Sequence, residues 1–411
     1  MKKTIILGVL TLTLVQTANA ELVINDSSTQ PPTYNIQPTH THNSSSHTHN
    51  ETPHTHTHDS STHMHEHDEV PNFARSATQM TVAAQALINS LSDDQKASVI
   101  YDFNDDNART YWTNAPTDSQ SRNGLPIGRF SIEQRELLHN LLKASTSSQG
   151  YYKIWAAVQG DDELKREGEN RELDSDKFFT KNRSLGAIGY YVSFYGDPTT
   201  DSKWGYMITG HHLAANFTVI DGQTTFVPMF YGSDPATISQ GQHAGYTFLP
   251  QERNRGWELF NSLNAEQQQK ALINIEYPSN RFGPIDFKGP GKKDVPIENR
   301  GIRGDELTDA QQRLLWVLIE EYVGNADFDI AEAWIEKIKQ DGINNLYFMW
   351  MGPTDGSEKI FFRVNGPSIL IDFADQRTGF DWNTHPHTIV RDPSNDYGED
   401  WLQRHIEEFH K

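Results

Sequence analysis

The chain has 411 residues, no cysteine and a formal net charge of −20 at pH 7. Without cysteine it can form no disulfide and offers no thiolate, so any metal ion must be held by nitrogen and oxygen ligands. The acidic balance disfavours nucleic acids and anionic membranes as partners, because like charges repel each other.

The N-terminus has the pattern of a secretory signal peptide. Two lysines precede a short apolar stretch, and a small-x-small sequence ends at Ala20. We therefore expect residues 1–20 to be removed and the mature protein to be periplasmic or secreted. No other apolar stretch approaches the roughly 20 residues that a transmembrane helix needs, so we expect no membrane insertion.

Residues 21–75 form a low-complexity segment of Ser, Thr, Pro, Asn and His, with few apolar residues to build a core. Neutral imidazoles bind zinc, copper and nickel, and a flexible chain can wrap several of them around one ion. We expect this His-rich arm to capture metal with modest affinity; the alternative is a simple hydrophilic tether. Its candidate ligands are ten histidines, mostly spaced as His-x-His: His40, His42, His47, His49, His54, His56, His58, His63, His65 and His67.

From about residue 76 the chain has the composition of a globular protein, which we expect to be a single α+β domain over residues 76–411. Its sequence also repeats. The stretch that starts at Ser131 resembles the one that starts at Thr308, and the stretch around Gly196 resembles the one around Gly352. We predict an internal duplication with pseudo-twofold symmetry. The predicted parts are one copy over about 76–221, a second copy over about 256–375, and a C-terminal tail over 376–411.

Local signals indicate how each copy folds. Ser131 and Thr308 each precede a leucine-rich helical pattern, so we expect both to be helix N-caps. Aromatic and β-branched residues around a turn signal predict that a β-hairpin follows the helices of each copy. The link between the copies should add strands and a loop, because hairpins of this length need a neighbouring sheet to be stable.

The hairpin of the first copy contains two adjacent histidines, His211 and His212. If they lie in a strand, their side chains point to opposite faces unless Gly210 forms a bulge. Pro367 and Ser368 occupy the matching positions of the second copy, so the hairpin itself does not need histidines. We interpret at least one of the two as a metal ligand; a buried structural histidine is the alternative.

The C-terminal tail contains a second pair, His385 and His387, on either side of Pro386. In an extended segment, residues i and i+2 share a face and can present two imidazoles to one ion. The proline predicts that this segment lies at an edge or rim of the sheet. Together with His211 or His212, the pair supplies three nitrogens, the usual set for a zinc, copper or iron site with an open position.

The same tail contains Arg391 and Asp392. We consider Asp392 a candidate fourth ligand or general base, or a residue that orients a ligand histidine. Arg391 is a candidate for holding a substrate carboxylate through two hydrogen bonds. The alternative is a structural Arg–Asp pair before the last helix. His139 is expected on a helix surface.

Several stretches resemble the bacterial and fungal family called domain of unknown function 3500. They are the Gly-His-His-Leu sequence at Gly210, the helix sequence QRLLWVLIEEYVGN, and above all HPHTIVRDPSNDYG from His385 to Gly398. The resemblance covers nearly the whole globular part, from about Ser76 to His410. It implies membership of the family, and no activity follows from it.

These patterns lead to three hypotheses of function. The first is an exported metal-binding protein with a mononuclear histidine site, zinc being the first choice and copper or iron the alternatives; with a bound water it would act as an enzyme on a small molecule. The second is a periplasmic metal buffer or chaperone that acts through the arm and docks on a metal transporter. The third is a metal-free module for a small acidic or sugar ligand. The sequence has no His-Glu-x-x-His and no Gly-x-Ser-x-Gly, so common catalytic motifs do not choose between these hypotheses.

Overall fold

The computed structural model describes residues 73–116, 121–170, 185–238, 244–274, 297–356, 359–377 and 384–409. The expected signal peptide and the ten histidines of the His-rich arm lie outside these residues. Within the described ranges, no helix combines the length and the apolar character that crossing a membrane requires.

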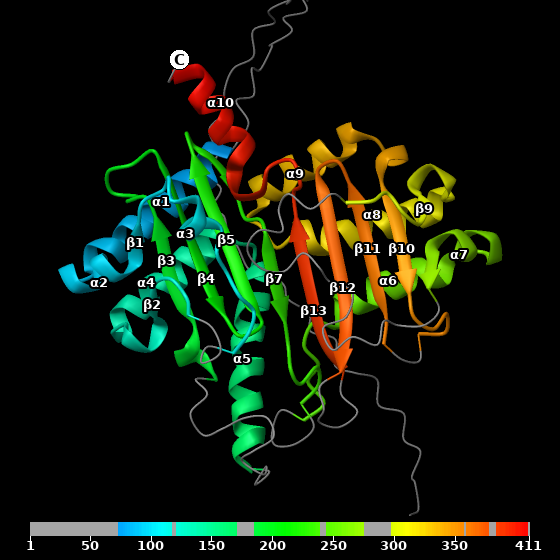
Figure 1. The fold of residues 1–411 in the computed structure, drawn as a ribbon, viewed down its shortest axis with the longest axis horizontal. Coiled ribbons are helices and arrows are strands. Elements are labelled where there is room, and N and C mark those ends of the chain that lie inside the picture. Colours follow the sequence, from blue (N-terminus) through cyan, green and yellow to red (C-terminus); the bar gives the residue numbers. More distant parts are fainter. Residues whose placement is uncertain are drawn as a thin grey trace, which may run out of the picture. The chain divides into compact units, whose positions relative to one another are not determined.

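Helices and one mixed sheet make this an α+β protein (Figure 1). The helices are α1 (Phe73–Ser90), α2 (Asp93–Val99), α3 (Asp106–Thr110), α4 (Ile132–Ser145), α5 (Ser148–Asn170), α6 (Pro250–Ser262), α7 (Ala265–Ala271), α8 (Asp309–Val323), α9 (Phe328–Asp341) and α10 (Glu399–Phe409). The strands are β1 (Ile100–Tyr101), β2 (Leu125–Pro126), β3 (Tyr191–Tyr195), β4 (Lys203–Gly210), β5 (Leu213–Ile220), β6 (Gln223–Thr225), β7 (Met229–Gly232), β8 (Leu272–Asn274), β9 (Ile302–Arg303), β10 (Tyr347–Met351), β11 (Phe361–Gly366), β12 (Ile369–Arg377) and β13 (Thr384–Arg391).

The main path of the sheet runs β1-β3-β4-β5-β7-β13-β12-β11-β10-β8. On one side of its centre, β1 pairs in parallel with β3, and the pairs β3–β4, β4–β5 and β5–β7 are antiparallel. On the other side, β8 pairs in parallel with β10, and the pairs β10–β11, β11–β12 and β12–β13 are antiparallel. The antiparallel pair β7–β13 joins the two sides. Outward from this pair, both halves therefore present the same order of strands, which can be followed in Figure 1.

The expected N-caps are confirmed. The Ser131 hydroxyl accepts the backbone N–H of Gln134, and the Gln134 side chain accepts the backbone N–H of Ser131. Thr308 and Gln311 form the same reciprocal pair at the start of α8. Each pair satisfies two N–H groups that the first helical turn leaves without partners, which fixes where α4 and α8 begin.

Two apolar clusters lie on the two faces of the sheet. The larger one packs most of the helices against one face, with residues such as Leu141 and Leu318 meeting Tyr206 and Phe362. The smaller one covers the other face with the segment that contains Trp112 and with the chain near α10. Phe230 and Ile389, in the central strands, belong to this second cluster.

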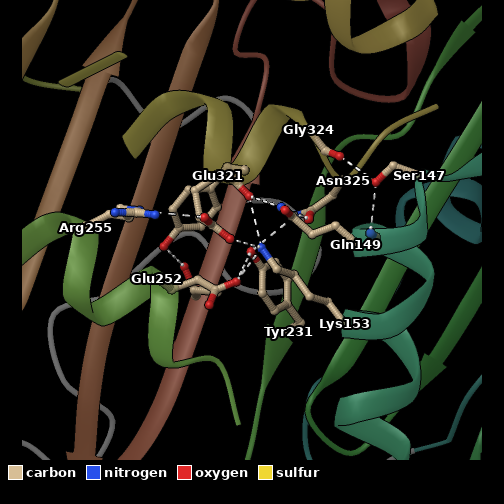
Figure 2. A network of polar contacts seen from close by, with 12 residues as sticks. Ser147, Gln149, Lys153, Tyr231, Glu252, Arg255, Glu321, Gly324 and Asn325 are labelled. Carbon is tan, nitrogen blue, oxygen red and sulfur yellow. Dashed lines mark hydrogen bonds and ion pairs between the residues drawn. The ribbon is translucent and has the colours of Figure 1, made fainter. Parts of the chain in front are cut away.

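A buried polar network joins the helices of the two halves (Figure 2). Lys153 of α5 reaches Glu252 of α6 at 2.7 Å and Glu321 of α8 at 2.8 Å. The side chains of Lys153 and Glu252 are 5 % and 1 % exposed. Tyr231 of β7 donates a hydrogen bond to Glu252 at 3.2 Å, so the network also holds the centre of the sheet. Burial, with Glu252 adding to it, raises the pKa of Tyr231 well above its ordinary value and keeps this hydroxyl a donor.

Replacing Lys153 should therefore lower the free energy of unfolding far more than breaking an exposed ion pair does. In Lys153→Met, the buried Glu252 carboxylate loses its cation and Glu321 keeps only the more distant Arg255, at 3.9 Å, so we expect the free energy of unfolding to fall by about 3–5 kcal/mol. Lys339→Met is the matched control, because Lys339 and Glu336 form a pair at 2.7 Å with both side chains about half exposed. Breaking it should cost about 0–1 kcal/mol. Denaturant unfolding measures both, and equal losses would contradict this account of the network.

Candidate metal centre

His211 and His212 form the turn between β4 and β5. Gly210 pairs with Leu213 across the hairpin, which leaves the two histidines as its central residues. The expectation that they lie in a strand and point to opposite faces is wrong, because β4 ends at Gly210. His212 has φ = 63°, in the left-handed region that non-glycine residues adopt uncommonly, although histidine does so more often than most. A histidine here carries a conformational cost, which favours a role for its ring.

Two hydrogen bonds hold this turn against the rest of the fold. The Tyr190 hydroxyl donates to the backbone carbonyl of His211 at 2.5 Å. Gly210 makes this possible, because a Cβ atom at Gly210 would overlap the Tyr190 ring. The backbone N–H of His212 donates to the carbonyl of Asn114 at 3.4 Å. The turn is thus fixed by Tyr190, the residue before β3, on one side and by the segment before β2 on the other.

His385 and His387 lie on β13, which is a central strand and not the expected edge strand. It pairs with β12 along its whole length, and with β7 from His387 to Val390. Pro386 lies just beyond the pairing with β7, so its missing N–H removes no bond from that ladder. Pro386 therefore lies near the end of a central strand, where the pairing with β7 has stopped, and this is the rim of the sheet that we expected.

The imidazoles of His212, His385 and His387 converge. Each offers one nitrogen, and the three nitrogens lie within 4.8 Å of one another. Nε2 of His212 and Nε2 of His385 are 2.7 Å apart. His212 and His387 are 1 % and 4 % exposed, whereas the His385 side chain is 13 % exposed. Two nitrogens are therefore shielded from water, while His385 gives the group a route to solvent.

Glycine at position 232 leaves room for one of these rings. Gly232 of β7 lies directly opposite His387 of β13. A Cβ atom at Gly232 would lie 2.7 Å from Cδ2 of His387 and 2.6 Å from the carbonyl oxygen of Pro386. Because φ of Gly232 is not positive, the requirement for glycine is one of space. The His387 ring fits against β7 only because no side chain is present there.

The environment keeps His212 neutral. Burial lowers the pKa of His212 well below its ordinary value, and the neighbouring His211, His385 and His387 lower it further. Its Nδ1 is buried and has no hydrogen-bond partner among the described residues. A neutral imidazole has a free lone pair, which is the form that binds a metal ion.

His211 does not join this group of nitrogens. Its ring stacks on the His212 ring with centroids 3.7 Å apart, and its Nδ1 lies 2.6 Å from Oδ1 of Asp161. Asp234 Oδ2 lies 3.9 Å from Nδ1 of His385. Sequence reasoning missed Asp161, Asp234 and Gly232, because no local pattern sets them apart from other acidic or glycine residues.

The structure places Arg391 and Asp392 away from the three histidines. Arg391 ends β13 and Asp392 follows it, so they are four and five residues beyond His387, a separation of at least about 13 Å at roughly 3.3 Å per strand residue. Asp392 pairs with Lys337 at 2.7 Å, and Arg391 pairs with Asp396 at 2.6 Å. Burial raises the pKa of Asp396 to about 7, although Arg391 lowers it. These contacts are those of the structural alternative, and they do not support Asp392 as a fourth ligand.

The comparisons with known proteins identify the family. A family model described as "Protein of unknown function (DUF3500)" matches residues 73–399. The chain belongs to this family. The match to DUF3500 includes both the turn at His212 and the strand with His385 and His387. No curated protein and no solved structure matches the chain.

The role of Gly232 can be tested directly. In Gly232→Ala the new methyl group must displace His387 or separate β7 from β13, so we expect zinc to bind at least about tenfold more weakly, since ligand distances must hold within about 0.2 Å. The free energy of unfolding should fall by about 1–3 kcal/mol. Gly128→Ala is the control, because its Cβ would meet only the side chain and Cα of Ile188, at 3.3 Å or more. Equal zinc affinity in Gly232→Ala and the parent would refute this role.

Proposed function

We propose that this protein is an exported metal-binding protein with a mononuclear site formed by His212, His385 and His387. The observation that carries the proposal is the convergence of three imidazole nitrogens within 4.8 Å, two of them on buried residues. Nε2 of His212 and Nε2 of His385 lie 2.7 Å apart, and each ring can present a lone pair to the space between the three side chains. Three imidazole nitrogens held this close together could bind one shared cation.

The donor set favours zinc, with copper or iron as alternatives. Three imidazoles without a thiolate suit all three metals. In zinc proteins, three protein ligands with a fourth position left for water or substrate are typical of catalytic sites, whereas structural sites have four protein ligands. A metal-dependent enzyme that acts on a small molecule is thus the form of the proposal that the ligand count favours. The partial exposure of His385 would let such a molecule approach.

The other two hypotheses have less support in the described residues. A metal-free module for acidic ligands would use Arg391, but this guanidinium is 3 % exposed and paired with Asp396. A metal buffer would act through the His-rich arm, which lies outside the described residues. We keep the arm as a second, weaker metal store that raises the local metal concentration near the folded site. Export rests on the signal-like pattern of residues 1–20.

We also infer that the two halves arose by duplication. The shared order of strands and the two matching capping boxes support this inference, as does the constant offset between the hairpin sequences. Aligned sequences of the family test it. Those of residues 131–220 should match those of residues 308–376 better than shuffled sequences of equal composition do. If they match no better, the duplication is refuted.

The metal site is tested by zinc stoichiometry in a full-length chain whose ten arm histidines are replaced with asparagine. This parent should keep about one tightly bound ion per chain and lose the weaker binding of the arm. His385→Ala, His387→Ala and His212→Asn should each lose that ion, since two nitrogens hold zinc poorly. Asparagine suits the left-handed backbone at position 212, so His212→Asn removes the ligand without adding strain.

His139→Ala provides the matched control. His139 is a partly buried histidine that bonds Tyr151 at 2.8 Å and stacks on Trp155, outside the group of three. Its replacement should leave zinc binding intact. Should the three site variants keep their ion and lose only about 1–3 kcal/mol of unfolding free energy, these histidines are hydrogen-bonding core residues and the proposal fails.

A further inference from the structure

We propose that Asp161 is a positioning residue that sets the metal affinity of this site through His211. The inference rests on the proposed function, because it concerns the same three-histidine group. Asp161 lies on α5, far in sequence from both histidine pairs, and its carboxylate contacts His211 and the backbone of Gly186. It can act on the three ligands through the His211 side chain that it holds and through its charge.

The geometry fixes the Asp161 carboxylate at both oxygens. Asp161 is 1 % exposed; Oδ1 lies 2.6 Å from Nδ1 of His211, and Oδ2 accepts the backbone N–H of Gly186 at 2.7 Å. A carboxylate can only accept, so Nδ1 of His211 carries the proton. The orientation of the His211 ring follows from this bond. In many metal sites, a carboxylate accepts a hydrogen bond from the second ring nitrogen of a ligand histidine. Here the carboxylate bonds His211 instead, and the His211 ring stacks on the ligand His212.

The His211 ring in turn holds the ring of a ligand. The two imidazoles stack with centroids 3.7 Å apart and planes inclined by 30°. His212 lies in a two-residue turn, where the backbone alone leaves its side chain free to rotate. The stacked His211 ring, together with the neighbouring His385 and His387 rings, limits that freedom before an ion binds, so less ordering remains for the ion to impose. Asp161 thus presets the direction of His212.

Charge supplies a second contribution. Three neutral imidazoles leave the two positive charges of a divalent ion uncompensated in a buried site, which is unfavourable without anions nearby. Asp161 beside His211 and Asp234, 3.9 Å from His385, are carboxylates near the rings. Arg122 interacts electrostatically with Asp161 and opposes its charge, but this guanidinium also donates a hydrogen bond to the carbonyl of Thr113. The negative charge of Asp161 favours a cation at the histidines.

The test measures zinc affinity by chelator competition, and the absorption of bound cobalt(II), in the full-length chain with the ten arm histidines replaced. Asp161→Asn keeps an acceptor near His211 and removes the charge, whereas Asp161→Ala removes both. We expect zinc to bind about 10–100-fold more weakly in these variants, and the cobalt(II) spectrum to change as His212 loses its fixed direction. The unfolding midpoint of the metal-free protein serves as the structural readout.

A double-mutant cycle shows whether the effect passes through His211. His211→Phe keeps a ring against His212 and removes the bond to Asp161. In that background, Asp161→Asn should keep only the part of its effect that comes from charge, so it should weaken zinc binding by a smaller factor than in the parent; full additivity would overturn the proposal. Asp392→Asn, a buried ion-paired carboxylate at the far end of β13, is the control and should leave zinc affinity unchanged. If the parent binds no zinc, the proposed function fails. If the parent binds zinc and the Asp161 variants match it, only the role of Asp161 fails.

Discussion

The antiparallel pairing of β7 with β13 is the constraint on which the candidate site depends. Without it, the turn at His212 and the strand with His385 would belong to separate halves of the chain. The pairing places His387 opposite Gly232, and the carbonyl of His212 accepts the backbone N–H of that glycine at 2.9 Å. One short ladder thus joins the sheet and brings the imidazoles together. The buried network around Lys153 reinforces the same junction from the helix side (Figure 2).

Several residues in and around the three-histidine group have features that favour the arrangement of the rings and lower local stability. His212 occupies a backbone region that favours glycine or asparagine, and Gly232 leaves a central strand without a side chain. Asp161 buries a carboxylate beside His211. In the matching turn of the other half, neither Pro367 nor Ser368 has a positive φ. Such local departures from the best folding choices are typical of functional sites.

Features encoded by neighbouring residues could be predicted from the sequence, and features encoded by distant pairing could not. The N-caps at Ser131 and Thr308 and the shared face of His385 and His387 follow from short-range rules, and the family model matches the stretches that carried the resemblance. The central place of β13 depends on which distant strand it meets. Pro386 suggested an edge, because a sequence does not reveal where one ladder stops within a sheet. Asp161 also lacked a local signal, since its partner lies 50 residues away.

The last strand in the chain fills the middle of the sheet. β13 lies between β7 and β12, although every other strand precedes it in sequence. The seam between the two halves cannot close without residues 384–391, because β13 supplies the pairing on both of its sides. His385 and His387 lie on this strand, so the group of three nitrogens also depends on it. A chain that stops before His385 would leave β7 and β12 without their shared neighbour β13. It would also lack two of the three histidines, so the candidate site can form only in a chain that includes β13.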